Sequence, residues 1–363
     1  MSKIYNNDKT KEKAIMVYAC LNTKENTELK MSELKSLIKA NDIEVLGSLV
    51  QNIKEPDLSF LIGKGKLEEL KEMVTNLNAN LIVFQNSLTG SKINNLEEYL
   101  NCKVIDRTML ILDIFAQRAK SNEGKIQVEL AQLKYTLPRL AGVAKSSGRF
   151  GSSGTGMRGP GETKLELDRR KIENQIAYKQ KELNKLKDER DIRRKQRINT
   201  NQKTVALVGY TNSGKSTLMN TISKSDVFIK DMLFATLDTT TRKVFLDLNN
   251  TILLTDTVGF VSDLPHELVD AFSATLEESF SADLLINVVD ISDPEHTHKE
   301  TVTKEVLKKL GVNLKKVLTI YNKIDKMHKL NTKGYLEISA KNNINIDKLK
   351  TKIIEFFNNN KTL

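Results

Sequence analysis

The chain has 363 residues, of which 39% are hydrophobic and 28% are charged, and its formal net charge at pH 7 is +11. This composition is typical of a globular protein of two or three domains. The N-terminus lacks the apolar segment of a secretory signal, and the most apolar run, residues 284–291, is too short to cross a bilayer. Cys20 and Cys102 have no metal-ligand spacing, so we expect a cytoplasmic protein without structural zinc.

Short apolar runs alternate with amphipathic segments over residues 1–106, which predicts a small N-terminal α/β domain. Strands are expected at residues 14–20, 44–50, 81–84 and 103–105, and helices at 31–40, 66–77 and 94–100. Ser91 is a candidate cap for the last helix. The stretch IGKGKLEEL, residues 62–70, lacks the spacing of a phosphate loop, so it is either a turn into a helix or a ligand site.

Residues 107–200 have the pattern of a helical hairpin. Apolar residues recur at helical spacing from residue 108 to 137 and again from 165 to 192. The segment between them, about residues 141–161, holds seven of the 17 glycines. A loop of about 20 residues is uncommon unless it is functional or disordered. We therefore predict two helices joined by a basic, glycine-rich tip loop.

Arginine is concentrated in the same hairpin. Nine of the 12 arginines lie between Arg139 and Arg197, although the chain contains 45 lysines. The guanidinium group offers a planar, bidentate fork for phosphates and base edges, whereas lysine would serve a solvated helix face equally well. We predict that the hairpin contacts RNA. The alternative is that the tip loop is a disordered linker whose arginines only keep it solvated. The predicted RNA-contacting residues are Arg149, Arg158, Arg169 and Arg170.

Strands and helices alternate regularly over residues 201–363, which predicts a doubly wound α/β domain with a mainly parallel sheet. The stretch GYTNSGKS follows an apolar strand, opens a helix and matches the phosphate-loop pattern G-x-x-x-x-G-K-[ST]. Lys215 would reach the β- and γ-phosphates, and the Ser216 hydroxyl would bind Mg²⁺. The residues predicted to contact nucleotide here are Gly209, Tyr210, Thr211, Asn212, Ser213, Gly214, Lys215, Ser216 and Thr217.

Three further motifs follow in order and indicate that the base is guanine. Asp325 in NKID can accept the N1 and N2 protons of guanine, a donor pair that adenine lacks. DTVG, at the end of another strand, would supply a carboxylate on the Mg²⁺ side and a glycine N–H for the γ-phosphate, and SAK would close over the base. The residues predicted here are Asp256, Thr257, Val258, Gly259, Asn322, Lys323, Ile324, Asp325, Ser339, Ala340 and Lys341.

A switch segment, FATLDTTTR, lies between these motifs. Such a segment must offer a hydroxyl to Mg²⁺ only when the γ-phosphate is present, and we choose Thr236, which with Lys215 is the predicted catalytic pair. Residues 239–241, all threonines, are weaker candidates. Phe260 stands where many regulatory GTPases have a water-orienting glutamine; whether or not it packs in the core, that glutamine is missing. The nucleotide contacts predicted here are Phe234, Ala235, Thr236, Leu237 and Asp238.

Nearly the whole chain resembles the HflX family of GTPases. The resemblance is carried by RTMLILDIFAQRA, EGKIQVELAQLKYTLPRL and RGPGETKLELDRR between Arg107 and Arg170, and by GYTNSGKST, FATLD and DTVGF. It implies binding to the large (50S) ribosomal subunit and its rRNA, dissociation of stalled or idle 70S ribosomes, and Mg²⁺ held by Ser216 and Thr236. The family motif often reads FATLDPTTR, and Thr239 in place of the proline is expected to loosen the switch. Some members carry an additional C-terminal domain, whose function is not carried over.

These observations together predict a GTP-hydrolysing factor that is slow alone, is stimulated by ribosomes and acts as a monomer. Two alternatives remain open. One is a ribosome-binding factor that uses GTP without hydrolysing it, which Phe260 favours slightly. The other is an RNA-remodelling enzyme with a second, ATP-binding site in the N-terminal domain.

Overall fold

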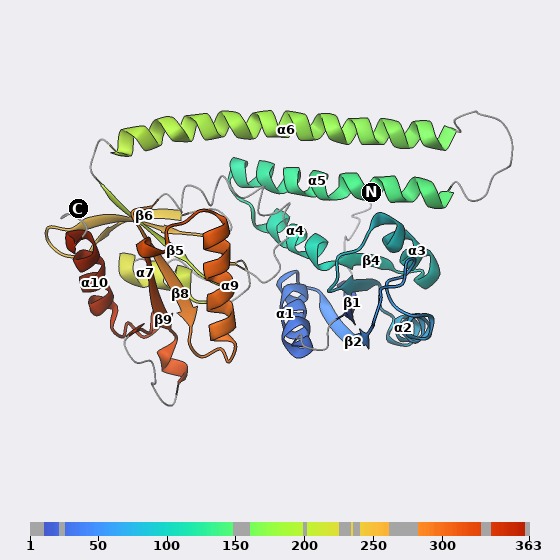
Figure 1. The fold of residues 1–363 in the computed structure, drawn as a ribbon, viewed down its shortest axis with the longest axis horizontal. Helices are drawn as coiled ribbons and strands as arrows, with labels where there is room; N and C mark the ends of the chain where they lie inside the picture. The colour runs from blue at the N-terminus through green and yellow to red at the C-terminus, as the bar shows by residue number, and fades with distance from the viewer. Residues whose placement is uncertain are drawn as a thin grey trace, which may run out of the picture. The chain divides into compact units, whose positions relative to one another are not determined.

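A computed structural model describes residues 11–21, 26–147, 160–198, 202–224, 234, 240–260, 282–327 and 335–359. The chain divides into two compact units, each with its own sheet (Figure 1). Unit 1 comprises Met1–Gln117 and Glu129–Gln180, and unit 2 comprises Arg118–Val128 and Lys181–Leu363. Among the described residues, no helix combines the length and the apolar character needed to cross a membrane.

Unit 1 contains a four-stranded parallel sheet in the order β2-β1-β3-β4. Helices α2 and α3 cover one face, where Leu70 and Leu96 pack in one cluster with Ile82 of the sheet. Helix α1 packs against β1 and β2. The α/β fold predicted for the N-terminal part is therefore confirmed. Its elements are β1 (Lys13–Cys20), α1 (Thr27–Ala40), β2 (Glu44–Asn52), α2 (Lys64–Leu77), β3 (Leu81–Phe84), α3 (Gly90–Leu100), β4 (Lys103–Asp106) and α4 (Arg107–Arg118).

Helices α1, α2 and α3 begin two to four residues before the expected positions 31, 66 and 94, and one expected cap and one expected helical run also differ. Thr89, and not Ser91, caps α3, because Thr89 Oγ1 accepts a hydrogen bond from the Lys92 backbone N–H. The helical run expected from residue 108 to 137 is two helices, α4 and α5 (Asn122–Ser147). Ser121 divides them, since its hydroxyl oxygen accepts a 2.9 Å hydrogen bond from the Gly124 backbone N–H and caps α5. The stretch at residues 62–70 is a turn into α2.

Helices α5 and α6 (Pro160–Ile198) provide the expected helical pair, and their segments within unit 1 lie side by side (Figure 1). Proline suits the first position of α6 because that residue needs no N–H donor and its φ is already helical. Both helices extend into the segment predicted as the tip loop. Residues 148–159 lie outside the described residues, and with them Arg149 and Arg158.

Unit 2 contains a six-stranded sheet in the order β10-β9-β8-β5-β7-β6, in which β6 runs antiparallel to β7 and the other pairs are parallel. This is the mainly parallel sheet that the sequence predicts. Its elements are β5 (Lys203–Val208), α7 (Lys215–Ser223), β6 (Thr240–Phe245), β7 (Thr251–Asp256), β8 (Leu284–Asp290), α9 (His296–Lys309), η1 (Leu314–Lys316), β9 (Val317–Asn322), η2 (Ile324–Lys326), β10 (Leu336–Glu337) and α10 (Ile346–Asn359).

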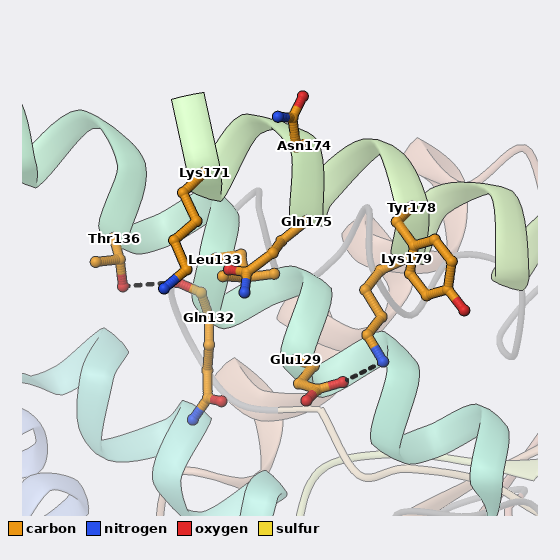
Figure 2. Close-up of a pocket in the computed structure, with 9 residues that line it drawn as sticks. All are labelled: Glu129, Gln132, Leu133, Thr136, Lys171, Asn174, Gln175, Tyr178 and Lys179. Atoms are coloured by element: carbon orange, nitrogen blue, oxygen red, sulfur yellow. Dashed lines mark hydrogen bonds and ion pairs between the residues drawn. The ribbon is translucent and has the colours of Figure 1, made fainter. Parts of the chain in front are cut away.

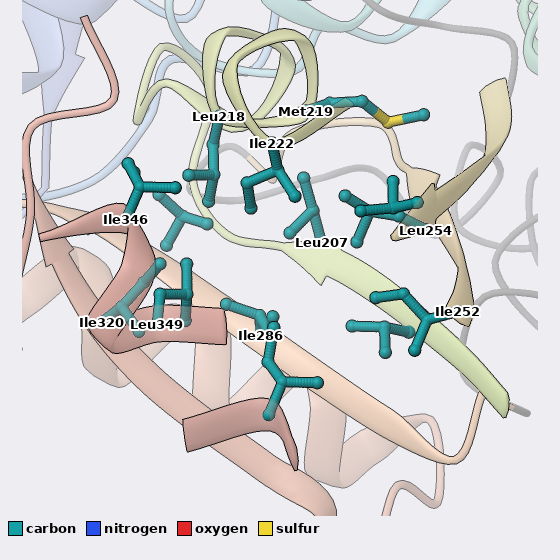
Figure 3. Close-up of a cluster of buried hydrophobic side chains, with 14 of the residues drawn as sticks. Leu207, Leu218, Met219, Ile222, Ile252, Leu254, Ile286, Ile320, Ile346 and Leu349 are labelled. Carbon is teal, nitrogen blue, oxygen red and sulfur yellow. The ribbon is translucent and has the colours of Figure 1, made fainter. Parts of the chain in front are cut away.

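Helices cover both faces of this sheet. On one face, Leu218 of α7 and Leu349 of α10 pack over Leu207 and Ile286 of the central strands (Figure 3). On the other face, Leu307 of α9 joins a second buried cluster. Because the strands of this sheet other than β6 run parallel, their carboxyl ends lie at one edge of the sheet, where ligands bind in doubly wound folds.

Candidate nucleotide site

The phosphate loop joins β5 to α7 and depends on two glycines. Gly209 has φ +141° and Gly214 has φ +94°, values that other residues rarely adopt. The space is also restricted, since a Cβ atom on Gly209 would lie 2.4 Å from the Val288 carbonyl oxygen. A Cβ atom on Gly214 would lie 2.3 Å from Asn322 Nδ2. The glycines therefore allow the loop to pass directly against β8 and the end of β9.

Lys215 is buried in the first turn of α7. Its ammonium group donates hydrogen bonds to the carbonyl oxygens of Gly209, at 3.0 Å, and Tyr210, at 2.8 Å. Burial lowers the pKa of this ammonium to about 8, against a smaller opposing effect of the Asp256 carboxylate and with a further lowering by Lys323. A cation held by backbone carbonyls and withdrawn from water would be stabilised by an incoming phosphate.

Ser216 and Asp256 form the next part of the site. Asp256 ends β7, which pairs in parallel with β5, so its carboxylate lies at the edge that carries the phosphate loop. Ser216 Oγ donates a 2.6 Å hydrogen bond to Asp256 Oδ2. Hydroxyl and carboxylate oxygens are the ligand type that Mg²⁺ prefers, so these residues fit a magnesium site. Gly259 also packs against the loop, since a Cβ atom there would lie 2.7 Å from Thr211 Cα.

Two residues of the NKID motif connect separate loops. The buried Asn322 amide donates to the Ser213 carbonyl at 2.9 Å and accepts from the Ala340 backbone N–H at 3.0 Å. The Lys323 ammonium donates to the Asn212 carbonyl at 2.7 Å. The phosphate loop, the NKID motif and the SAK motif are thus held together by direct hydrogen bonds.

Asp325 lies in η2 with its carboxylate exposed. The Ser339 hydroxyl donates a 2.5 Å hydrogen bond to Asp325 Oδ1 and itself accepts from the Asn342 backbone N–H at 3.1 Å. Ile324 is buried beneath the same short helix, while Lys341 is exposed. Ser339, the first residue of the SAK motif, therefore orients the carboxylate that is predicted to recognise guanine.

The switch segment is described only in part. Phe234 is buried with φ +53°, and its carbonyl accepts a 3.0 Å hydrogen bond from Arg118 Nη1. Among the weaker candidates, Thr241 lies in β6 and its hydroxyl is 3.0 Å from that of Thr255. Thr239 is not among the described residues. Ala235, Thr236, Leu237 and Asp238 also lie outside the described residues, and the role of Thr236 as a ligand stays a prediction.

Phe260 packs in the core. Its side chain is 2% exposed and belongs to the cluster with Leu285 and Leu307 beside α9. Its backbone is tied to the phosphate loop, because its N–H donates to the Gly209 carbonyl at 3.0 Å and its carbonyl accepts from the Thr211 N–H at 2.7 Å. A buried phenyl ring cannot orient an attacking water, so this position has a structural role.

Two residues of the site escape sequence reasoning. Asp290 ends β8 and pairs with Lys323 at 2.8 Å, which helps to hold that lysine over the phosphate loop. An acidic residue at the carboxyl end of an apolar strand is the signal that could have revealed it, as it did for Asp256. Arg118, which contacts Phe234, gives no such signal, since its partner lies 116 positions away in the sequence.

The fold and the site together define a P-loop GTPase, an enzyme that binds and hydrolyses GTP. Three family models match the chain in succession. They are described as GTP-binding GTPase N-terminal, over residues 28–116, GTP-binding GTPase Middle Region, over residues 118–197, and 50S ribosome-binding GTPase, over residues 204–323.

Curated relatives give the family. A GTPase HflX of Caldanaerobacter subterraneus is 48% identical over 341 residues, which cover 93% of this chain and 79% of the relative. A GTPase HflX of Escherichia coli is 42% identical over 316 residues, which cover 86% of this chain and 73% of the relative. The chain belongs to the HflX family of GTPases. A crystal structure of a GTP-binding protein from Sulfolobus solfataricus in complex with GDP also matches, with a TM-score of 0.50 and 25% identity over 94% of this chain and 98% of that one.

Proposed function

We propose that this GTPase binds the rRNA of the large ribosomal subunit and dissociates stalled or idle 70S ribosomes. The observation that carries the proposal is the concentration of arginine in the hairpin, which holds nine of the 12 arginines of the chain between Arg139 and Arg197. The match of residues 204–323 to a model described as a 50S ribosome-binding GTPase supports the ribosome as the source of the RNA.

Arg169 and Arg170 are available for such contacts. Both lie on α6 with side chains that are 56% and 68% exposed, and each pairs with a glutamate one helical turn away, Glu173 and Glu166. Exposed pairs of this kind contribute about 0–1 kcal/mol, so a phosphate can replace the carboxylate at little cost. Arg149 and Arg158 are proposed to act in the same way at the tip.

In the proposed mechanism, Lys215 and the phosphate loop hold the β- and γ-phosphates of GTP. The Ser216 hydroxyl would bind Mg²⁺, and the Asp256 carboxylate lies beside it. Thr236 is proposed to be the second protein ligand of Mg²⁺ when the γ-phosphate is present. When bound, Mg²⁺ neutralises the charge that develops on the phosphate oxygens. Asp325 accepts the two guanine protons, and Ser339 holds its carboxylate in place.

The switch has a direct link to the middle region of the chain. Arg118, the last residue of α4, donates to the carbonyl of Phe234, two positions before Thr236. A rearrangement of the switch after hydrolysis would therefore act on the connection that leads from α4 into α5. This link supports control of ribosome binding by the nucleotide.

Hydrolysis by the isolated protein is expected to be slow. The Phe260 ring is buried and its backbone is bonded to the phosphate loop, so this position supplies no group to orient water. Activating partners accelerate GTPases by about 10³–10⁵-fold when they supply the missing group. We propose that the ribosome is the activating partner of this protein. We also propose that the protein acts in the cytoplasm as a monomer.

A light-scattering assay of 70S dissociation in the presence of GTP tests the proposal. Replacing Arg149, Arg158, Arg169 and Arg170 with alanine should weaken ribosome binding and flatten its salt dependence by up to about one unit of slope per lost phosphate contact. GTP affinity should stay unchanged, because none of these residues belongs to a nucleotide motif. The matched control replaces the same four residues with lysine, which should recover part of the affinity. Parent-like dissociation by the alanine variant at every salt concentration would contradict the proposal.

A further inference from the structure

Within unit 1, α5 and α6 enclose a groove of about 470 Å³ (Figure 2). One wall is a continuous face of α6, because its residues follow the three- and four-residue steps of a helix. They are Lys171, Asn174, Gln175, Tyr178 and Lys179. This face carries two lysines, two amides and an aromatic ring, and no aliphatic side chain.

The opposite wall belongs to α5 and explains why the groove stays open. Adjacent helices normally close on each other by burying apolar faces. The buried residues of α5 in this region, Leu130, Ala131 and Tyr135, do not line the groove. Leu133 is the one aliphatic residue among those that line it. Two faces made mostly of polar residues therefore meet here, although the carbon stems of these side chains line much of the groove. A recess remains where a packed seam of aliphatic side chains would otherwise form.

The polar groups of the groove are arranged along its length. Figure 2 shows Lys171 directed toward α5 at one end, Gln175 directed toward Leu133 in the middle, and Lys179 paired with Glu129 at the other end. The Lys179–Glu129 distance is 2.9 Å. Next to this pair, Tyr178 is 62% exposed, and the Lys179 ammonium lies 6.0 Å from the centre of its ring.

We infer that this groove is a binding site for an unpaired RNA nucleotide. Single-stranded RNA is recognised by stacking of a splayed-out base on an exposed aromatic ring, by hydrogen bonds to the base edges and by cations near the phosphates. Tyr178 supplies the ring, the Gln175 amide both donates and accepts, and Lys171 supplies a positive charge. Only the source of the RNA, the large ribosomal subunit, rests on the proposed function.

The same features disfavour other occupants. An amphipathic protein helix would require a row of apolar side chains to receive its anchors, and Leu133 is the one aliphatic residue among those that line the groove. Double-stranded RNA is recognised across its shallow minor groove through 2′-hydroxyl and phosphate groups, so it needs no recess between two helices. A volume of about 470 Å³ lies in the range of sites that enclose a single small ligand or base.

The test measures binding of the full chain to a fluorescently labelled ten-nucleotide oligo(U) or oligo(A) strand and to a blunt RNA duplex of the same length. The parent should prefer the single strands. Tyr178→Ala should weaken single-strand binding by roughly 5- to 150-fold, the range for loss of one stacked base. Tyr178→Phe, the matched control, keeps the ring and should bind like the parent. Tyr178→Leu keeps apolar area without an aromatic plane and should behave like Tyr178→Ala.

Equal binding of duplex and single strands by the parent, or parent-like binding by Tyr178→Ala, would overturn the inference. Thermal unfolding checks that the variants fold, which the exposure of Tyr178 favours. If Tyr178→Ala binds RNA normally but loses the large subunit, the groove contacts a protein and the RNA site is refuted. If the parent fails to bind ribosomes while its RNA binding depends on Tyr178, the proposed ribosomal function fails and the groove stands.

Discussion

Replacing Asn322 with alanine should destabilise unit 2 and weaken nucleotide binding together. The Asn322 side chain is 2% exposed and makes two hydrogen bonds to backbone groups, with the Ser213 carbonyl at 2.9 Å and the Ala340 N–H at 3.0 Å. Leaving a buried backbone group without its partner costs about 1–3 kcal/mol. Two such groups lower the free energy of unfolding by about 2–5 kcal/mol, once some entry of water is allowed.

For a domain of this size, 1 kcal/mol shifts the midpoint of thermal unfolding by about 2–4 °C, so the expected decrease is roughly 4–20 °C. Calorimetry of the nucleotide-free protein measures it, and titration with a fluorescent GDP analogue measures the accompanying loss of affinity. Asn342→Ala is the matched control, since that asparagine is exposed in the loop that carries the Ala340 N–H, and its replacement should stay within about 0.5 kcal/mol of the parent. An Asn322→Ala protein that unfolds and binds GDP like the parent would refute the proposed clamp between the loops.

Three further variants or conditions address the rest of the site. Asp325→Asn should shift preference from GTP toward xanthosine triphosphate, because the amide cannot accept both guanine protons; unchanged GTP affinity in a competition assay would show that another group recognises the base. Gly209→Ala places a Cβ atom 2.4 Å from the Val288 carbonyl at φ +141°, so GDP affinity measured by calorimetry should fall by more than about tenfold, and parent-like affinity would contradict this loop geometry. The pKa of Lys215 is lowered by burial from its ordinary value of 10.5 to about 8, so GDP affinity should decrease as the pH rises through 8 and the ammonium loses its proton. Between about pH 8 and 10.5, Lys215 is largely deprotonated in the folded nucleotide-free protein but protonated in the unfolded chain. The contribution of Lys215 to the free energy of unfolding should therefore rise with pH in this range. Lys215→Met should abolish that rise.

The nucleotide motifs could be predicted from the sequence because their chemistry is local. The spacing from Gly209 to Ser216 determines a loop that exposes backbone N–H groups. DTVG and NKID each begin at the last residue of a strand, and SAK follows a strand closely. Parallel strands place their carboxyl ends at one edge, so the assembly of the motifs follows from the strand pattern. The helical hairpin follows in the same way from apolar residues at helical spacing.

Only the tertiary structure shows which residues far apart in the sequence are in contact and which side chains are buried. From the sequence, Phe260 stands in the usual place of a water-orienting glutamine whether or not it packs in the core, and only the cluster beneath α9 shows that its ring is buried. The link from Arg118 to Phe234 and the pairing of Asp290 with Lys323 join residues far apart in the chain.

The groove illustrates the same limit. The polar face of α6 around Tyr178 has the sequence pattern of an ordinary solvated helix surface. It becomes one wall of a recess because the facing part of α5 offers a single aliphatic side chain, Leu133, for packing, while the buried residues Leu130 and Ala131 do not line the groove.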